Sequence, residues 1–205
     1  HLLNRGVDKR KIFMDKKDYY RFIHDLFEFN DRNPTQNIYY RLPFLKSQSY
    51  EVKPRKIARE KKPRKFLVHI LAFCLMPNHY HLMVRQKRDN GISVFMQKLG
   101  IGYTSTFNKK YERSGTIFEG RFKAKHLDYD EYLKYMFAYI HLNPVRANLA
   151  KDPIEWPWSS HPAYTNSSRN NLVRTDFILQ IFDSDPRMAR DKYVDFIYAG
   201  LNNQT

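Results

Sequence analysis

Residues 66–85 read FLVHILAFCLMPNHYHLMVR and set the frame for the fold. The first part, Phe66 to Met76, is almost wholly apolar, which predicts a strand buried on both faces. Pro77-Asn78 interrupts the apolar run with turn chemistry. We therefore expect His79 to Arg85 to return as the hairpin partner of the first strand.

The returning strand carries two histidines on either side of a tyrosine. Side chains alternate between the two faces of a strand, so His79 and His81 point to one face and Tyr80 points to the other. Two imidazoles side by side supply part of a metal site. If this hairpin binds a metal, the rest of the chain must supply a third ligand.

Length and composition favour one domain with appendages, or one domain and a small second one. The chain has 205 residues, of which 42% are hydrophobic, enough for a core. No apolar run approaches the length of a membrane span, and charges near the N-terminus do not fit a signal peptide. The single cysteine, Cys74, excludes an intramolecular disulfide. We interpret it as a core residue of a cytoplasmic protein.

The chain is strongly basic. Lysine and arginine number 36 against 21 acidic residues, a formal net charge of +15. Such a charge favours a polyanionic partner, above all nucleic acid, because cationic side chains contact phosphates and release counterions. The alternative is a basic surface that only keeps the protein soluble. The cations are densest at 53–65, inside a proline-containing stretch, 31–65, that we expect to be an insertion.

The N-terminal part predicts a short strand and a helix. His1 to Gly6 fits a strand that ends in turn chemistry. Asp15 is a credible N-cap, and Asp18 follows in the first helical turn. Apolar residues then recur at helical spacing up to about Asn30.

After the hairpin, a second helix is expected from Gly91 to the break at 113–115. Residues 117–127 are expected to be extended, with a basic face. A third helix is expected from about Tyr129 to Leu142, ended by Pro144, because the residue before a proline disfavours helix. In the tail, residues 177–182 and 193–198 are amphipathic helix candidates.

The third helix offers groups that could complete a site. Tyr139 and Asn143 are four residues apart and therefore share a helix face. A phenol and an amide oxygen on that face could serve as a nucleophile and a hard-oxygen metal ligand, which with two imidazoles suits Mg²⁺ or Mn²⁺. Taken alone, the spacing favours an ordinary core or surface tyrosine over a nucleophile, since the chain has 15 tyrosines.

A set of motifs in the chain resembles one family. The chain resembles the IS200/IS605-like single-tyrosine transposases, in particular the REP-associated tyrosine transposases, which are HUH endonucleases named for their His-hydrophobic-His motif. The resemblance covers roughly residues 1–165. The matching stretches, in family order, are Asn4-Arg5-Gly6, Met76 to His81, Arg113 to Lys123, Tyr139 to Ala147, and Trp156 to Ser160.

The resemblance implies a fold and a division of the chain. The fold is α+β, with a ferredoxin-like or RNA-recognition-like antiparallel sheet and helices on one face. Residues 1–165 would form the transposase domain, with the basic insertion at about 31–65. Residues 166–205 would form a small helical C-terminal extension.

The resemblance also implies the chemistry. His79 and His81 would bind one divalent metal with Asn143 as the third ligand, and Tyr139 would be the nucleophile. Attack on single-stranded DNA at a hairpin would leave a 5′-phosphotyrosine and a free 3′-hydroxyl, and the reverse attack would rejoin strands during DNA transposition and recombination. The expected DNA-binding residues are Arg5, Lys9, Arg10, Arg121, Lys123 and Lys125.

Three other interpretations stay open at this point. Tyr103 is a rival nucleophile, although its helical neighbours place it on a core face. A catalytically silent nucleic-acid-binding module of the same fold is a second. A His-x-His-x-His hydrolase is the third, and it lacks a histidine because position 83 is Met83. His141 is expected to be structural or to face DNA, and whether cleavage acts within one protomer or across a homodimer is not determined by the sequence.

Overall fold

The protein is built on a four-stranded antiparallel sheet in the order β2-β3-β1-β4. A computed structural model describes residues 1–33, 63–128, 130–165 and 172–202. The strands are β1 (Leu2–Arg5), β2 (Val68–Met76), β3 (His79–Gln86) and β4 (Lys123–Ala124). The β2–β3 hairpin turns at Pro77-Asn78, as expected, and the strand near the N-terminus pairs with β3.

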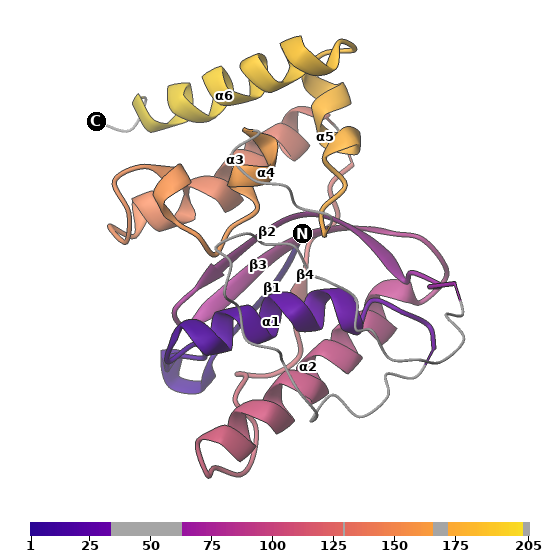
Figure 1. The fold of residues 1–205 in the computed structure, drawn as a ribbon, viewed down its shortest axis with the longest axis vertical. Coiled ribbons are helices and arrows are strands. Elements are labelled where there is room, and N and C mark those ends of the chain that lie inside the picture. The colour runs from indigo at the N-terminus through magenta and orange to yellow at the C-terminus, as the bar shows by residue number, and fades with distance from the viewer. Residues whose placement is uncertain (34–62, 129, 166–171, 203–205) are drawn as a thin grey trace.

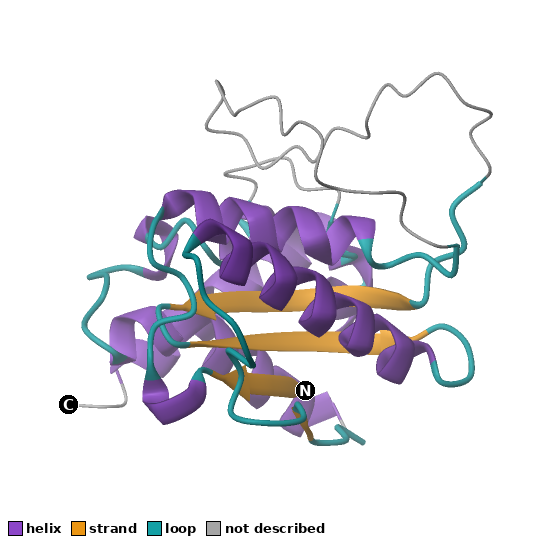
Figure 2. Cartoon of the chain, turned by 90° about the horizontal axis from the view of Figure 1, so that it is seen from below, coloured by secondary structure: helices purple, strands orange, loops and turns teal. Residues whose placement is uncertain are grey.

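Helices cover both faces of the sheet. Figure 1 shows α1 and α2 below the strands and α3 to α6 above them, and Figure 2 shows the first two helices from below. The helices are α1 (Lys16–Glu28), α2 (Gly91–Lys110), α3 (Asp130–Arg146), α4 (His161–Tyr164), α5 (Thr175–Phe182) and α6 (Pro186–Asn202), with 3₁₀ turns at η1 (Val7–Lys9) and η2 (Pro153–Glu155). In the described ranges, no helix combines the length and apolarity needed to cross a membrane.

The α+β class with an antiparallel sheet is confirmed, and the placement of helices differs from the expectation in one respect. The helices were expected on one face of the sheet. Helices α1 and α2 do lie on one face, but α3 packs on β2 and β3 from the other face. The cause is visible in β2, which is buried along almost its whole length. A strand that is apolar on both sides must be covered on both sides.

The α1–α2 face holds an aromatic core around Tyr80. Its ring lies 4.9 Å from that of Phe22 on α1 and 5.9 Å from that of Phe118, between ring centroids. The start of α1 follows the sequence expectation, because the Asp15 side chain accepts from the backbone of Asp18 and the Asp18 side chain accepts from that of Asp15. This capping box satisfies amide groups at the helix N-terminus.

One sequence expectation is wrong, and another holds only in part. Pro144 does not end α3, which continues to Arg146. A proline removes one backbone donor, but Pro144 is buried, and just beyond the helix end the amide of Ala147 donates to the carbonyl of Asn143. The extended segment at 117–127 forms a regular strand only at Lys123–Ala124.

The C-terminal part is joined to the sheet through the 156–160 motif. The backbone of Leu75 on β2 donates to Trp158, and the backbone of Ser160 donates to Phe73. Beyond it, α5 packs on α6, and α6 packs on α3. Most of the predicted basic insertion, residues 34–62, lies outside the described residues. Its two ends meet, because the amide of Arg32 donates to the carbonyl of Lys65 at 2.9 Å.

Candidate active site

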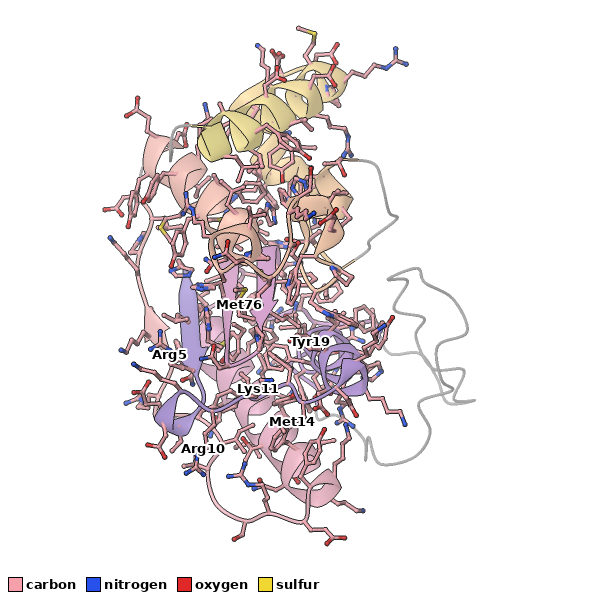
Figure 3. All side chains as sticks on the ribbon, turned by 90° about the vertical axis from the view of Figure 1, so that its left-hand side faces the viewer. Arg5, Arg10, Lys11, Met14, Tyr19 and Met76 are labelled. Atoms are coloured by element: carbon pink, nitrogen blue, oxygen red, sulfur yellow. The ribbon has the colours of Figure 1, made fainter. Side chains whose placement is uncertain are left out.

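The two histidines of the motif lie on the face of the sheet that α3 covers. His79 pairs with Arg5 on β1 and with Met76 on β2, and His81 pairs with Leu3 and Cys74. The ring centroids of His79 and His81 are 5.0 Å apart. Figure 3 shows Arg5 and Met76 between the helices of the two layers, at the level of this site.

Helix α3 brings Tyr139 to this pair. The ring of Tyr139 meets the ring of His81 edge-on, with 5.5 Å between centroids. Tyr139 is half-buried, so its ring is held while part of it stays accessible. The structure therefore brings together the histidine pair and the tyrosine that lie about 60 residues apart in the sequence.

The rival tyrosine, Tyr103, lies elsewhere. It is 1% exposed in the core between α1, α2 and the sheet, and its hydroxyl donates to the carbonyl of Ile12 at 2.6 Å. Burial raises its pKa well above the usual value. A tyrosine that is buried and already hydrogen-bonded is a poor nucleophile, so Tyr103 is a core residue.

A neighbouring asparagine fixes the protonation of His79. The amide nitrogen of Asn78 donates to the carbonyl of Lys9 at 3.1 Å, which turns the amide oxygen toward His79 Nδ1 at 2.6 Å. An amide oxygen only accepts, so His79 Nδ1 carries the proton. The Nε2 atom of His79 then keeps its lone pair, as a metal ligand requires.

His81 is more deeply buried and has one nitrogen without a partner. It is 2% exposed, and its Nδ1 lies 2.9 Å from Nε2 of His1. Its Nε2 is buried and has no hydrogen-bond partner. A buried polar atom without a partner costs stability, so a ligand bound at this atom would remove that cost.

Both motif histidines are held neutral. Burial first, and then the charge of Arg5, lowers the pKa of His79 to about 4. Burial, with smaller effects of His79 and Arg5, lowers the pKa of His81 to about 3. Neutral imidazole is the form that binds metals, so both rings are available as ligands over the whole neutral range.

Asn143 lies one turn after Tyr139 on α3, and its side chain differs from the expectation. The sequence predicted a side chain free to turn inward at a frayed helix end. Instead the amide nitrogen donates to the carbonyl of Tyr139 at 3.1 Å, one helical turn earlier. That bond leaves the amide oxygen for a cation. Among the described residues, no three His, Cys, Asp or Glu side chains gather into a metal site, so an oxygen such as that of Asn143 would have to complete one.

The structure adds two residues that the sequence interpretation missed. Arg146 follows Tyr139 by two turns on the same helix face, and its guanidinium carbon lies 5.4 Å from the centroid of the phenol ring. The spacing 139, 143, 146 could have revealed it. His1, which directly precedes β1, contacts His81 from 80 residues away in sequence, and no local pattern predicts such a contact.

The predicted DNA-binding residues fall into separate groups. Arg5 is half-buried beside His79. Lys9 and Arg10 are exposed in the turn after β1, where Arg10 pairs with Asp8 at 3.3 Å. Lys123 is exposed on β4, where it pairs with Leu3 of β1, and Leu3 in turn pairs with His81 of β3. Lys125 is also exposed, and its ammonium lies 4.5 Å from the ring centroid of Tyr132 on α3.

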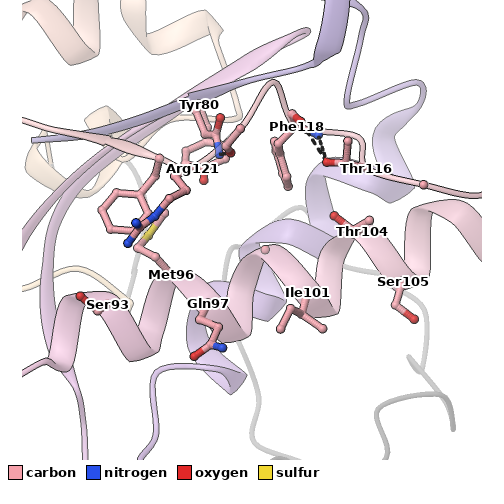
Figure 4. Close-up of a pocket in the computed structure, with 15 residues that line it drawn as sticks. Tyr80, Ser93, Met96, Gln97, Ile101, Thr104, Ser105, Thr116, Phe118 and Arg121 are labelled. Atoms are coloured by element: carbon pink, nitrogen blue, oxygen red, sulfur yellow. Dashed lines mark hydrogen bonds between the residues drawn. The ribbon is translucent and has the colours of Figure 1, made fainter.

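Arg121 lies apart from Lys123 and Lys125. The sequence predicted one basic face for Arg121, Lys123 and Lys125, but Arg121 lines a cavity of about 800 Å³ beside α2 and Tyr80 (Figure 4). Tyr80 points away from the two histidines, so this cavity lies on the opposite face of the sheet. A second hollow, of about 620 Å³, adjoins the site on the α3 side, where His1, Met83 and Lys125 line it.

His141 is structural, which is one of its two expected roles. It is fully buried, its Nε2 lies 2.7 Å from the hydroxyl of Ser160, and its Nδ1 lies 3.0 Å from the hydroxyl of Tyr193. That hydroxyl also contacts Nδ1 of His161. This buried network joins α3 to α4 and α6, on the side of α3 away from Tyr139.

Comparison with known proteins gives the family. The sequence profile described as "Transposase IS200 like" matches residues 37–143, which is more than half of the chain. The chain belongs to the IS200-like transposase family. The match includes His79, His81, Tyr139 and Asn143, and the family processes DNA. No curated protein matches the chain.

A solved structure supports the fold of this IS200-like transposase. It is described as a REP-associated tyrosine transposase bound to a REP hairpin, and it shares 14% sequence identity with this chain. The similarity covers 80% of this chain and 76% of that chain, with a TM-score of 0.51. The two chains therefore share the α+β architecture.

Proposed function

We propose that this IS200-like transposase cleaves and rejoins single-stranded DNA at hairpins, with Tyr139 as the nucleophile and a divalent metal, Mg²⁺ or Mn²⁺, bound by His79, His81 and Asn143. The proposal rests on the approach of Tyr139 on α3 to His81 on β3, with 5.5 Å between their ring centroids. Because both residues come from one chain, we propose that cleavage acts within one protomer.

The residues present fit a hard divalent cation. Nδ1 of His79 is occupied by Asn78, Nε2 of His81 is buried without a partner, and Asn143 offers an amide oxygen. Two imidazoles and one oxygen leave positions open for water and substrate. When bound, the cation would polarise the scissile phosphate as a Lewis acid.

The covalent step follows from the phenol. The Tyr139 oxygen attacks phosphorus and loses its proton to solvent, the bond from phosphorus to the 3′ oxygen breaks, and the 3′ oxygen takes up a proton. The products are a 5′-phosphotyrosine and a free 3′-hydroxyl. Attack by a 3′-hydroxyl on the phosphotyrosine restores a phosphodiester and frees Tyr139. The guanidinium of Arg146, next to the phenol, would stabilise negative charge on phosphate and tyrosinate.

The DNA would lie along the α3 side of the sheet edge. Lys123 and Lys125 are exposed there, beside the hollow that His1 lines, and Arg5 is next to His79. The similar solved structure is bound to a REP hairpin, which supports hairpin DNA as the partner. Lys9, Arg10 and Arg121 would contact DNA farther from the scissile phosphate.

Covalent capture tests the proposal. Incubation with a single-stranded hairpin oligonucleotide and Mn²⁺ should give a DNA–protein adduct that survives denaturing electrophoresis. Tyr139→Phe and His79→Ala should give none. Tyr135→Phe is the matched control, since Tyr135 is exposed on the same helix and its loss should leave the adduct intact.

The outcomes separate the competing functions. If the wild-type protein binds the hairpin but never forms an adduct, the protein is a silent nucleic-acid-binding module of this fold. An adduct that persists in Tyr139→Phe and disappears in Tyr103→Phe would assign the reaction to the other tyrosine.

A further inference from the structure

We infer that His1 is the positioning residue of the metal ligand His81: its Nε2 accepts a hydrogen bond from His81 Nδ1–H and so reserves His81 Nε2 for the cation. This inference rests on the proposed function. It assigns to His1 a role that lies outside the ligand set of the two motif histidines and Asn143.

The geometry of His79 shows how such a residue acts. Asn78 holds His79 Nδ1 at 2.6 Å and leaves Nε2 as the free atom. At His81 the same pattern is built with another partner: Nδ1 lies 2.9 Å from His1 Nε2, and Nε2 is buried and unpartnered. Both histidines therefore have Nδ1 occupied and Nε2 available. Metal-binding histidines commonly have their second ring nitrogen hydrogen-bonded in this way, which fixes the tautomer and the ring orientation.

The backbone places His1 for this contact. On β1, Leu3 is directly opposite His81, and Leu2 is opposite Leu82. His1 is two residues before Leu3, so its side chain shares a face with Leu3 and reaches His81 diagonally across the strands. The backbone of His1 is held in turn by Lys125, whose amide donates to the His1 carbonyl at 2.8 Å.

The contact between the rings is specific. The rings of His1 and His81 are inclined by 13°, with centroids 5.2 Å apart. His81 cannot rotate without losing this contact and the edge-on contact with Tyr139. His1 therefore sets both which nitrogen of His81 carries a proton and where the other nitrogen points.

The test uses two substitutions of the same residue. His1→Phe keeps an aromatic ring but has no acceptor, whereas His1→Gln carries an amide oxygen at about the distance of the imidazole Nε2. The readout is Mn²⁺ affinity of the full chain without DNA, measured from the electron paramagnetic resonance signal of free Mn²⁺. We expect His1→Phe to weaken Mn²⁺ binding by about 10- to 100-fold and His1→Gln to retain most of the wild-type affinity.

A second measurement needs no substitution. Nitrogen-15 NMR of the metal-free protein should show His81 protonated at Nδ1, and a proton on Nε2 would overturn the inference. Unchanged Mn²⁺ affinity in His1→Phe, while His81→Ala loses binding, would overturn the role of His1 and leave the proposed metal site standing. Mn²⁺ binding that survives His79→Ala and His81→Ala would overturn both.

Discussion

Arg146, whose guanidinium lies beside the ring of Tyr139, offers the most informative single substitution. If its guanidinium stabilises charge at the reacting phosphate, Arg146→Gln should lower the single-turnover cleavage rate by about 100-fold. Arg146→Lys should retain part of the rate, because it keeps the charge but not the planar fork. Hairpin binding should change little in both variants, as a gel-shift titration would show.

Arg187→Gln is the control for this change, because Arg187 is exposed on α6. A wild-type cleavage rate in Arg146→Gln would remove this residue from the reaction. A loss of hairpin affinity as large as the loss of rate would make Arg146 a DNA-binding residue instead.

At the scale of elements, the packing of α1 on α2 depends on Gly102 and not on Gly100, two residues earlier on α2. A Cβ at Gly102 would collide with the ring of Phe29, the residue that follows α1, whereas a Cβ at Gly100 would meet nothing within 4 Å. Gly102→Ala should therefore lower the free energy of unfolding by about 1–3 kcal/mol. Gly100→Ala should raise it by up to about 1 kcal/mol, since alanine favours helix. Urea unfolding of both variants measures the difference, and equal effects would contradict this packing.

The buried network behind α3 predicts a pH dependence of stability. Burial lowers the pKa of His161 to about 4, against a smaller opposing effect of Asp152. The unfolded imidazole takes up a proton below about pH 6.5, but the folded one does so only near pH 4, so stability is lost as the pH falls through this window. His161 alone should make the free energy of unfolding about 2 kcal/mol lower at pH 5 than at pH 7.

Urea unfolding at the two pH values checks this expectation. His161→Gln should reduce the loss between pH 7 and pH 5 by about that amount, whereas His126→Gln, at an exposed position, should not. A pH dependence that is the same in His161→Gln and wild type would mean that His161 is not held neutral by the fold.

Local signals explain which elements the sequence could predict. The hairpin around Pro77-Asn78 and the capped start of α1 at Asp15 depend on neighbouring residues, and both are confirmed. Helix α3 passes Pro144 because tertiary burial outweighs one lost hydrogen bond. The contact of His1 with His81 depends on strand pairing, which a sequence pattern does not specify. The alternation along β3 was enough to place His79 and His81 on one face.

At the scale of the whole molecule, the net charge of +15 predicts binding that weakens steeply with salt. Lys123 and Lys125 should contribute to it near the site. Replacing both by alanine should reduce the slope of log affinity against log salt for a single-stranded hairpin by about 1.4 if each contacts one phosphate. Fluorescence anisotropy at several salt concentrations measures the slope.

Lys16→Ala with Lys17→Ala is the matched control, because these lysines are exposed at the start of α1, on the opposite face of the sheet. An equal change of slope in the control would show that the charge acts as a diffuse field and that DNA has no preferred face.

In the proposed reaction Tyr139, brought to His81 by α3, forms the bond to DNA. Mass spectrometry of the trapped adduct, after nuclease trimming and trypsin digestion, tests it most directly. The peptide 135–146 should carry the nucleotide, and because it contains both Tyr135 and Tyr139, fragmentation must locate the phosphate. The phosphate should lie on Tyr139, and a phosphate on any other residue would show that Tyr139 is not the nucleophile.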